Sequence, residues 1–226
     1  SGQDYPNIEH VIIDGGSTDG TVELVHEIEA ENIILINSTG HSFYESLNIG
    51  ISECSGEIIG ILNADDFFYS HTTISRVMQR FKDPGVDVVY GDVIFVERKY
   101  PTKIKRIWKA GVFSTQKLNF GWMPPHSAIF CRKKSVNLYL KYSNNFGWSA
   151  DYEFVLRLFR AQLNTHYLNA FLVIMRAGGV SNGSISKYCQ SLKWDLRAVK
   201  SIGVRSPYLT VLAKRVRKIT QFISCS

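Results

Sequence analysis

Short apolar runs alternate with segments of helical periodicity through the first half of this 226-residue chain, and this alternation restricts the fold more than any other feature. The runs at residues 11–13, 33–36 and 58–62 are continuously apolar, as is typical of strands buried on both faces. Between them, residues 21–30 and 43–54 carry apolar side chains at helical spacing. This order of strands and helices predicts an α/β fold with a mostly parallel sheet flanked by helices.

The second half of the chain continues with less regular spacing. We expect further helices at residues 72–81 and 149–162, further strands at residues 86–97, 127–131 and 171–176, and a strand at residues 104–108 that pairs back as a hairpin. Two helical stretches at the end are separated by Gly203 and Pro207. The sequence therefore predicts one α/β domain at residues 1–183 and a basic helical tail at residues 184–226.

Composition narrows the class of protein. No apolar stretch reaches the roughly 18–20 residues that cross a bilayer, and the chain opens with polar residues rather than a signal peptide. The four cysteines are scattered without CxxC spacing, which disfavours structural zinc and favours a reduced, cytoplasmic setting. The net charge of +6 suits phosphate-bearing partners in general. The chain has no zinc-finger, RNP or helix-turn-helix pattern, so nucleic acid is not an expected partner.

Two adjacent carboxylates, Asp65 and Asp66, follow the apolar run at residues 58–62. Ligands of open parallel sheets bind beyond the carboxyl ends of the strands. A hard cation such as Mg²⁺ or Mn²⁺ often binds one or two carboxylates together with substrate phosphates. The pair therefore predicts a metal that bridges protein and diphosphate, although either residue could simply cap the helix that follows.

A second acidic turn, "IIDGGSTDGT", follows the first apolar run and places Asp14 at the end of that strand. Its glycines would let the backbone approach a ligand closely. The turn lacks the GK[ST] of a P-loop and is not GxGxxG. The alternative is a plain strand-to-helix turn in which Thr18 or Asp19 caps the next helix.

A third carboxylate, Asp151, opens the helix predicted at residues 149–162. A carboxylate is favoured there because of the helix dipole and the unpaired N–H groups of the first turn. Asp151 could also serve as a general base that removes a proton from an acceptor hydroxyl. Capping and catalysis are compatible at this position.

The stretches "PNIEHVIIDGGSTDGTVELV", "SLNIGISECSGEIIGILNADDFF" and "WSADYEFVLRL" together resemble family 2 glycosyltransferases of the GT-A fold. The resemblance implies an inverting enzyme that moves a sugar from a nucleotide-diphospho-sugar, usually a UDP-sugar, to a saccharide or lipid-linked acceptor, with Mn²⁺ or Mg²⁺. It implies that Asp151 is the catalytic base and that His126 lies on the acceptor side, although His126 could equally be a structural hydrogen-bonding residue. Asp65 would bind the metal, with Asp66 beside it. Donor contacts would come from Asp14, Gly15, Ser17, Asn48, Gly50, Asn63 and Asp65.

The sequence also departs from the family pattern. Asn63 stands where the DxD motif has its first acid, Gly15 replaces a common second acid, and the QxxRW signature of processive members is absent. The family's first strand and helix have no counterpart ahead of "QDYPNIEH". We therefore expect weak donor binding, or a homodimer formed across the exposed strand edge.

Two alternative functions remain open, and so does the role of the tail. The chain could be a sugar nucleotidyltransferase, although no Gly-rich phosphate loop is visible, or a non-catalytic relative that acts as a binding module. The tail at residues 206–226 mixes apolar and basic residues. It could rest on anionic lipid at the inner face of a membrane, or pack on the domain as an ordinary helix with its charges solvated.

Overall fold

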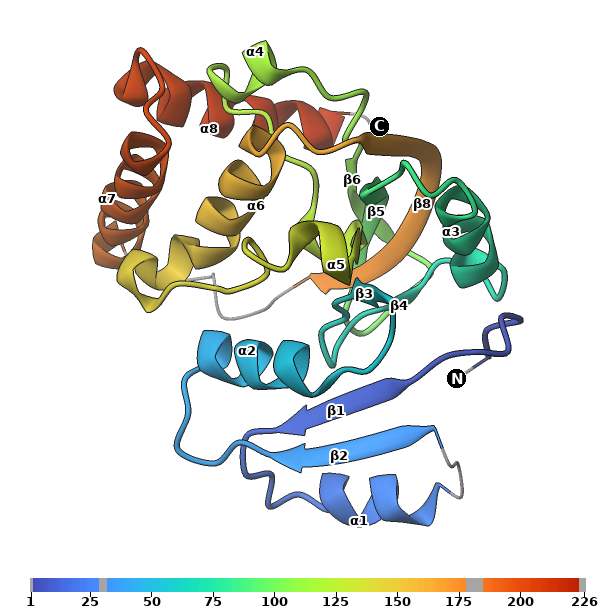
Figure 1. Ribbon diagram of the computed structural model, residues 1–226. Helices are drawn as coiled ribbons and strands as arrows, with labels where there is room; N and C mark the ends of the chain where they lie inside the picture. The colour runs from blue at the N-terminus through green and yellow to red at the C-terminus, as the bar shows by residue number, and fades with distance from the viewer. Residues whose placement is uncertain (1, 29–31, 178–184, 224–226) are drawn as a thin grey trace.

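The computed structural model describes residues 2–28, 32–177 and 185–223. The first part of the chain forms a small two-stranded sheet in which β1 (His10–Asp14) and β2 (Ile33–Asn37) pair in parallel, with α1 (Thr21–Glu27) between them in sequence. α2 (Phe43–Glu53) lies beside β1 (Figure 1). Gly50 permits this approach, because a Cβ atom there would lie only 3.0 Å from Cγ1 of Ile13.

A six-stranded sheet forms the centre of the molecule, with the strand order β3-β7-β5-β8-β4 and with β6 paired to β5. Its strands are β3 (Ile58–Gly60), β4 (Phe67–Phe68), β5 (Val88–Glu97), β6 (Ile104–Trp108), β7 (Ile129–Arg132) and β8 (Thr165–Ala177). The two longest ladders, β1–β2 and β5–β8, are parallel, whereas the shorter ladders of β3, β4, β6 and β7 are antiparallel. The predicted α/β class and the β5–β6 hairpin are confirmed.

Helices cover the two faces of this sheet. Val88 and Val89 are neighbours on β5, so their side chains point to opposite faces, and each is fully buried in a different apolar cluster. α3 (Thr73–Phe81) covers the face of Val89 through Val77. α6 (Ala150–Arg160) covers the face of Val88, where the core is rich in aromatic rings.

The two C-terminal helices, α7 (Ile185–Ser201) and α8 (Pro207–Ile223), continue this second layer (Figure 1). Ala198 and Val199 of α7 and Val211 of α8 are buried in the same cluster as the α6 side chains. The helices expected for the tail are therefore present and packed on the domain. The predicted boundary at residues 183/184 falls at residues 178–184, which lie outside the described part of the chain.

Four short helical turns complete the described residues. They are α4 (Thr115–Leu118), a 3-10 turn at His126–Ala128, α5 (Lys133–Val136) and a 3-10 segment at Asn144–Ser149. Within residues 2–28, 32–177 and 185–223, no helix is both long and apolar enough to span a membrane. In the same residues no hydrogen-bond ladder joins β1 to β3, so the two sheets remain separate.

Candidate active site

Asp151 and His126 face each other at the start of α6. Asp151 lies in the first turn of the helix, and the His126 ring comes from the 3-10 turn that precedes β7. Nδ1 of His126 is 3.8 Å from Oδ2 of Asp151, and both side chains keep partial contact with solvent, at 18% and 30% exposure. A carboxylate in the first turn of a helix is stabilised as an anion by the helix dipole. This carboxylate is therefore accessible and adjacent to an imidazole, as a general base requires.

A sharp turn before α6 sets the position of this pair. Gly147 has φ +48°, and a Cβ atom there would lie 2.6 Å from the ring of Trp194. The next residue, Trp148, is 60% exposed. Its carbonyl oxygen accepts a 3.4 Å hydrogen bond from the hydroxyl of Tyr44 on α2. Burial, reinforced by the charge of Asp151, raises the pKa of Tyr44, so the phenol stays protonated beside the carboxylate.

The acidic turn after β3 separates its two carboxylates. Asp66 is buried and accepts a 2.8 Å hydrogen bond from Nδ2 of Asn63. Burial raises the pKa of Asp66, and a positive charge on His126 would partly offset that rise. Asp66, His126 and Asp151 therefore share one region of the structure. Asp65 points outward and forms an ion pair with Arg98, which follows β5.

The structure adds three residues to the site that sequence reasoning missed: Tyr44, Arg98 and Trp148. Arg98 lies just beyond the end of β5, so a basic side chain at a strand end was the available signal. For Trp148 the signal was an aromatic residue three positions before Asp151. Tyr44 carried no signal, because its contact depends on how α2 packs.

Asp14 closes its own turn at the end of β1. Its carboxylate accepts hydrogen bonds from the backbone N–H groups of Gly16 at 2.8 Å and Ser17 at 2.9 Å, and from the Ser17 hydroxyl. The hydroxyl bond, followed by the two N–H bonds, lowers the pKa of Asp14. Gly16 has φ +97°, and a Cβ atom there would meet Oγ1 of Thr39 at 2.7 Å. The turn is thus rigid and negatively charged.

Among the other predicted donor residues, Asn48 and Gly50 have packing partners. The Asn48 amide donates to the carbonyl of Tyr142 at 2.9 Å and accepts from its N–H at 2.7 Å. This pair of bonds ties α2 to the loop that leads toward Asp151. Gly50 packs on β1 as described above, whereas nothing lies within 4 Å of a Cβ atom built at Gly15. Donor contacts of all three residues stay predictions.

The acidic turn of Asn63 to Asp66 suits a metal ion whose ligands come mainly from the substrate. Within the described residues, no group of three or more His, Cys, Asp or Glu side chains could hold an ion. Mg²⁺ and Mn²⁺ often need only one or two protein carboxylates when phosphates complete the shell. Asp65 is accessible for that role, and the buried Oδ1 of Asn63 has no hydrogen-bond partner. Asp66 fits less well, because burial disfavours its ionised form.

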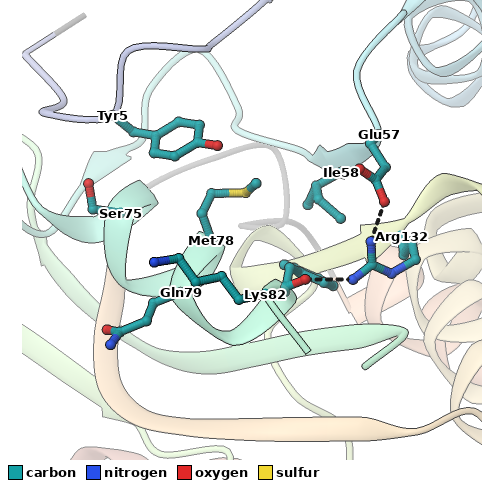
Figure 2. A pocket seen from close by; sticks show the side chains of 9 residues that line it. Tyr5, Glu57, Ile58, Ser75, Met78, Gln79, Lys82 and Arg132 are labelled. Atoms are coloured by element: carbon teal, nitrogen blue, oxygen red, sulfur yellow. Dashed lines mark hydrogen bonds and ion pairs between the residues drawn. The ribbon is translucent and has the colours of Figure 1, made fainter. Parts of the chain in front are cut away.

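A separate cavity of about 390 Å³ lies between the N-terminal segment, β3 and α3 (Figure 2). Its walls include Tyr5, Met78 and Arg132, and the Arg132 guanidinium binds the Glu57 carboxylate and the Phe81 carbonyl. None of the residues of the candidate site lines it. This cavity is therefore distinct from the carboxylates at the strand ends.

The α/β sheet, the carboxylates beyond its strands and the Asp–His pair at the start of α6 agree with the resemblance to glycosyltransferases seen in the motifs. The sequence model of glycosyl transferase family 2 matches residues 1–166. The chain belongs to this family, which confirms the resemblance seen in its motifs.

Two relatives illustrate the similarity in sequence. A "PGL/p-HBAD biosynthesis glycosyltransferase" of Mycobacterium bovis (strain BCG / Pasteur 1173P2) is 29% identical over 221 residues, which are 94% of this chain and 81% of the relative. The "UDP-Glc:alpha-D-GlcNAc-diphosphoundecaprenol beta-1,3-glucosyltransferase WfaP" of Escherichia coli is 24% identical over 212 residues, or 90% of this chain and 78% of the relative.

Solved structures share the fold. The mannosyltransferase PcManGT from Pyrobaculum calidifontis, in complex with GDP-Man and Mn²⁺, aligns with a TM-score of 0.63 at 15% identity and covers 99% of this chain and 67% of its own. S. aureus TarS 1-349 in complex with UDP aligns with a TM-score of 0.62 at 13% identity, covering 99% and 83%. Both likenesses bear on the fold alone.

Proposed function

We propose that this glycosyltransferase moves a sugar from a UDP-sugar to a hydroxyl of a saccharide or lipid-linked acceptor, with inversion at the anomeric carbon, in glycoconjugate synthesis. The observation that carries the proposal is the Asp151–His126 pair beside the acidic turn of Asn63 to Asp66. The names of the relatives support it: one uses UDP-Glc, and one of the similar folds was solved with UDP.

The reaction needs one base and no covalent intermediate. Asp151 takes the proton of the acceptor hydroxyl while that oxygen bonds to the anomeric carbon. The bond from this carbon to the diphosphate oxygen breaks at the same time, and the nucleoside diphosphate leaves. A single displacement inverts the anomeric centre. His126 lies within 4 Å of the base and orients its carboxylate or the acceptor.

Negative charge grows on the departing diphosphate, and the chain offers groups of both signs nearby. Asp65 would hold a divalent cation, which supplies electrostatic stabilisation of that charge. The Arg98 guanidinium is paired with Asp65. If a cation were bound by that carboxylate, the guanidinium would be free to contact a phosphate. The Asp14 carboxylate already accepts hydrogen bonds from within its own turn. Its role is therefore to hold this loop against the nucleoside.

The Asp151→Asn variant tests the proposal. The amide keeps the size of the side chain and an oxygen for the N–H of Tyr152, which Asp151 accepts at 2.7 Å. We expect transfer from UDP-sugars to fall roughly 10²- to 10⁴-fold, the usual contribution of a general base, with donor binding by calorimetry unchanged. Glu53→Gln, at an exposed carboxylate at the end of α2, is the matched control. Undiminished transfer in Asp151→Asn would refute the assignment.

A further inference from the structure

The outward face of α8 is apolar. Tyr208, Leu209, Leu212, Val216 and Ile219 are 53–69% exposed. Their spacing places them on one side of the helix, as in an amphipathic helix that buries its apolar face. In α8 that face points to solvent, which is the reverse of an ordinary surface helix.

The inward face of α8 carries polar side chains that anchor it firmly, beside the buried Val211. The Thr210 hydroxyl donates to the carbonyl of Asn119 at 2.7 Å. Nζ of Lys214 and a guanidinium nitrogen of Arg215 bind the two oxygens of Asp195 on α7, at 2.8 and 2.7 Å. Asp195 is 2% exposed, so these are buried ion pairs that fix the rotation of the helix. The apolar side therefore cannot turn inward without breaking them.

Positive charge accumulates along the edges of this helix. Lys218 lies near Arg106 of β6, Lys214 and Arg215, and these charges add to burial in lowering its pKa. Asp195 pairs with Lys214 and Arg215, whereas Arg106 and Lys218 take part in no ion pair within the described residues. Arg217 is exposed. The cluster is thus left with more cations than neighbouring carboxylates.

We propose that the outward face of α8 docks on an anionic lipid surface. A helix that lies in a membrane interface buries an apolar face at the boundary of headgroups and acyl chains, while flanking Lys and Arg bind anionic headgroups. α8 carries both parts, and its 17 residues span roughly 25 Å, long enough to lie along a bilayer. A second copy of the chain is the alternative occupant, and the oligomeric state distinguishes the two.

Flotation of the whole chain with vesicles tests this proposal. We expect binding to phosphatidylcholine vesicles that contain phosphatidylglycerol, little binding to pure phosphatidylcholine, and loss of binding at high salt. The double variant Leu212→Ser/Val216→Ser should reduce binding at least about tenfold, since each side chain loses its apolar burial. Arg217→Gln/Lys218→Gln should weaken binding to anionic vesicles alone. Leu138→Ser, at a leucine that is 88% exposed elsewhere, is the matched control.

Three results would overturn the proposal. They are an absence of binding to the anionic vesicles, equal loss in Leu138→Ser, and undiminished binding by Leu212→Ser/Val216→Ser. Light scattering completes the test. A dimer that disappears in Leu212→Ser/Val216→Ser, without vesicle binding by the parent chain, would show that a second copy covers this face.

Discussion

His126 precedes β7 and Asp151 lies in the first turn of α6, and their side chains meet with 3.8 Å between Nδ1 and Oδ2. This separation is longer than a hydrogen bond but short enough for the imidazole to steer the carboxylate. In the same region, Asp66 is buried and Asp65 faces outward. The candidate base thus has a partner that can orient it, and the acidic turn has one buried and one accessible carboxylate.

The first prediction concerns this pair. His126→Gln should lower kcat roughly tenfold and leave the donor KM unchanged, because the imidazole acts on the base rather than on the nucleotide. The double variant with Asp151→Asn should be no worse than Asp151→Asn alone, since both residues serve one proton transfer. Steady-state kinetics measure both effects, with His71→Gln at an exposed histidine as control. Fully additive losses in the double variant would contradict the coupling.

Much of the candidate site could be predicted from the sequence, because its carboxylates lie at strand ends and helix starts that local patterns locate. Asp14, Asp65 and Asp151 each follow a strand or open a helix, and such positions can be located from apolar periodicity. The partners of these residues could not be predicted in the same way. Arg98 lies 33 positions from Asp65, and the Asn48–Tyr142 pair spans 94 positions. Such contacts depend on how the helices and strands pack against one another once they have formed.

The fold shows the same limit. The run at residues 58–62 predicts a strand, but β3 is shorter and pairs antiparallel with β7. Apolar periodicity carries no information on strand direction. In the tail, the pattern marks an amphipathic helix without saying which side faces the core. Apolar side chains usually face inward, yet Asp195 fixes Lys214 and Arg215 on the inner side of α8. The buried carboxylate of Asp195 thus holds the charged side of α8 toward the core, which is the reverse of the usual orientation.

The second prediction follows from the ion pair between Arg98 and Asp65. Arg98→Gln should tighten Mn²⁺ binding by up to about fivefold in the absence of donor, because an exposed pair of this kind is worth about 0.2–1 kcal/mol. With donor present, turnover should fall, because the variant lacks the Arg98 guanidinium that can contact the diphosphate. Calorimetric Mn²⁺ titration and kinetics measure these effects, with Lys99→Gln as the neighbouring control. Weaker Mn²⁺ binding by Arg98→Gln would show that Arg98 does not compete with the metal for Asp65.

The third prediction compares two adjacent glycines in the Asp14 turn. Gly16→Ala should destabilise the protein by roughly 1–2 kcal/mol for the left-handed backbone alone, and the contact with Thr39 adds to this. UDP binding should weaken with it, because the loop that we propose to face the nucleoside is distorted. Gly15→Ala has open space around its Cβ and no positive φ, so it should leave stability nearly unchanged. Thermal unfolding and UDP titration of both variants provide the comparison, and equal effects would argue against strain.

The fourth prediction uses the buried carboxyl of Asp66, whose pKa is raised chiefly by burial. The folded protein then holds this proton more tightly than the unfolded chain does. The contribution of Asp66 to stability is therefore fully present below the unfolded pKa, about 3.9, and is lost as pH rises through the higher folded value. At neutral pH the ionised form carries a burial penalty that an uncharged side chain would not.

Asp66→Asn should consequently raise the melting temperature at neutral pH without added metal, while its amide oxygen can still accept from Asn63. A gain of about 1 kcal/mol corresponds to roughly 2–4 °C for a chain of this size. The gain should shrink in acid and vanish below the unfolded pKa of about 3.9, where the parent carboxyl is protonated in both states. Glu53→Gln, at an exposed carboxyl, should show no such pH-dependent gain. A difference between Asp66→Asn and the parent that grows toward acid would mean that the ionised carboxylate stabilises the fold.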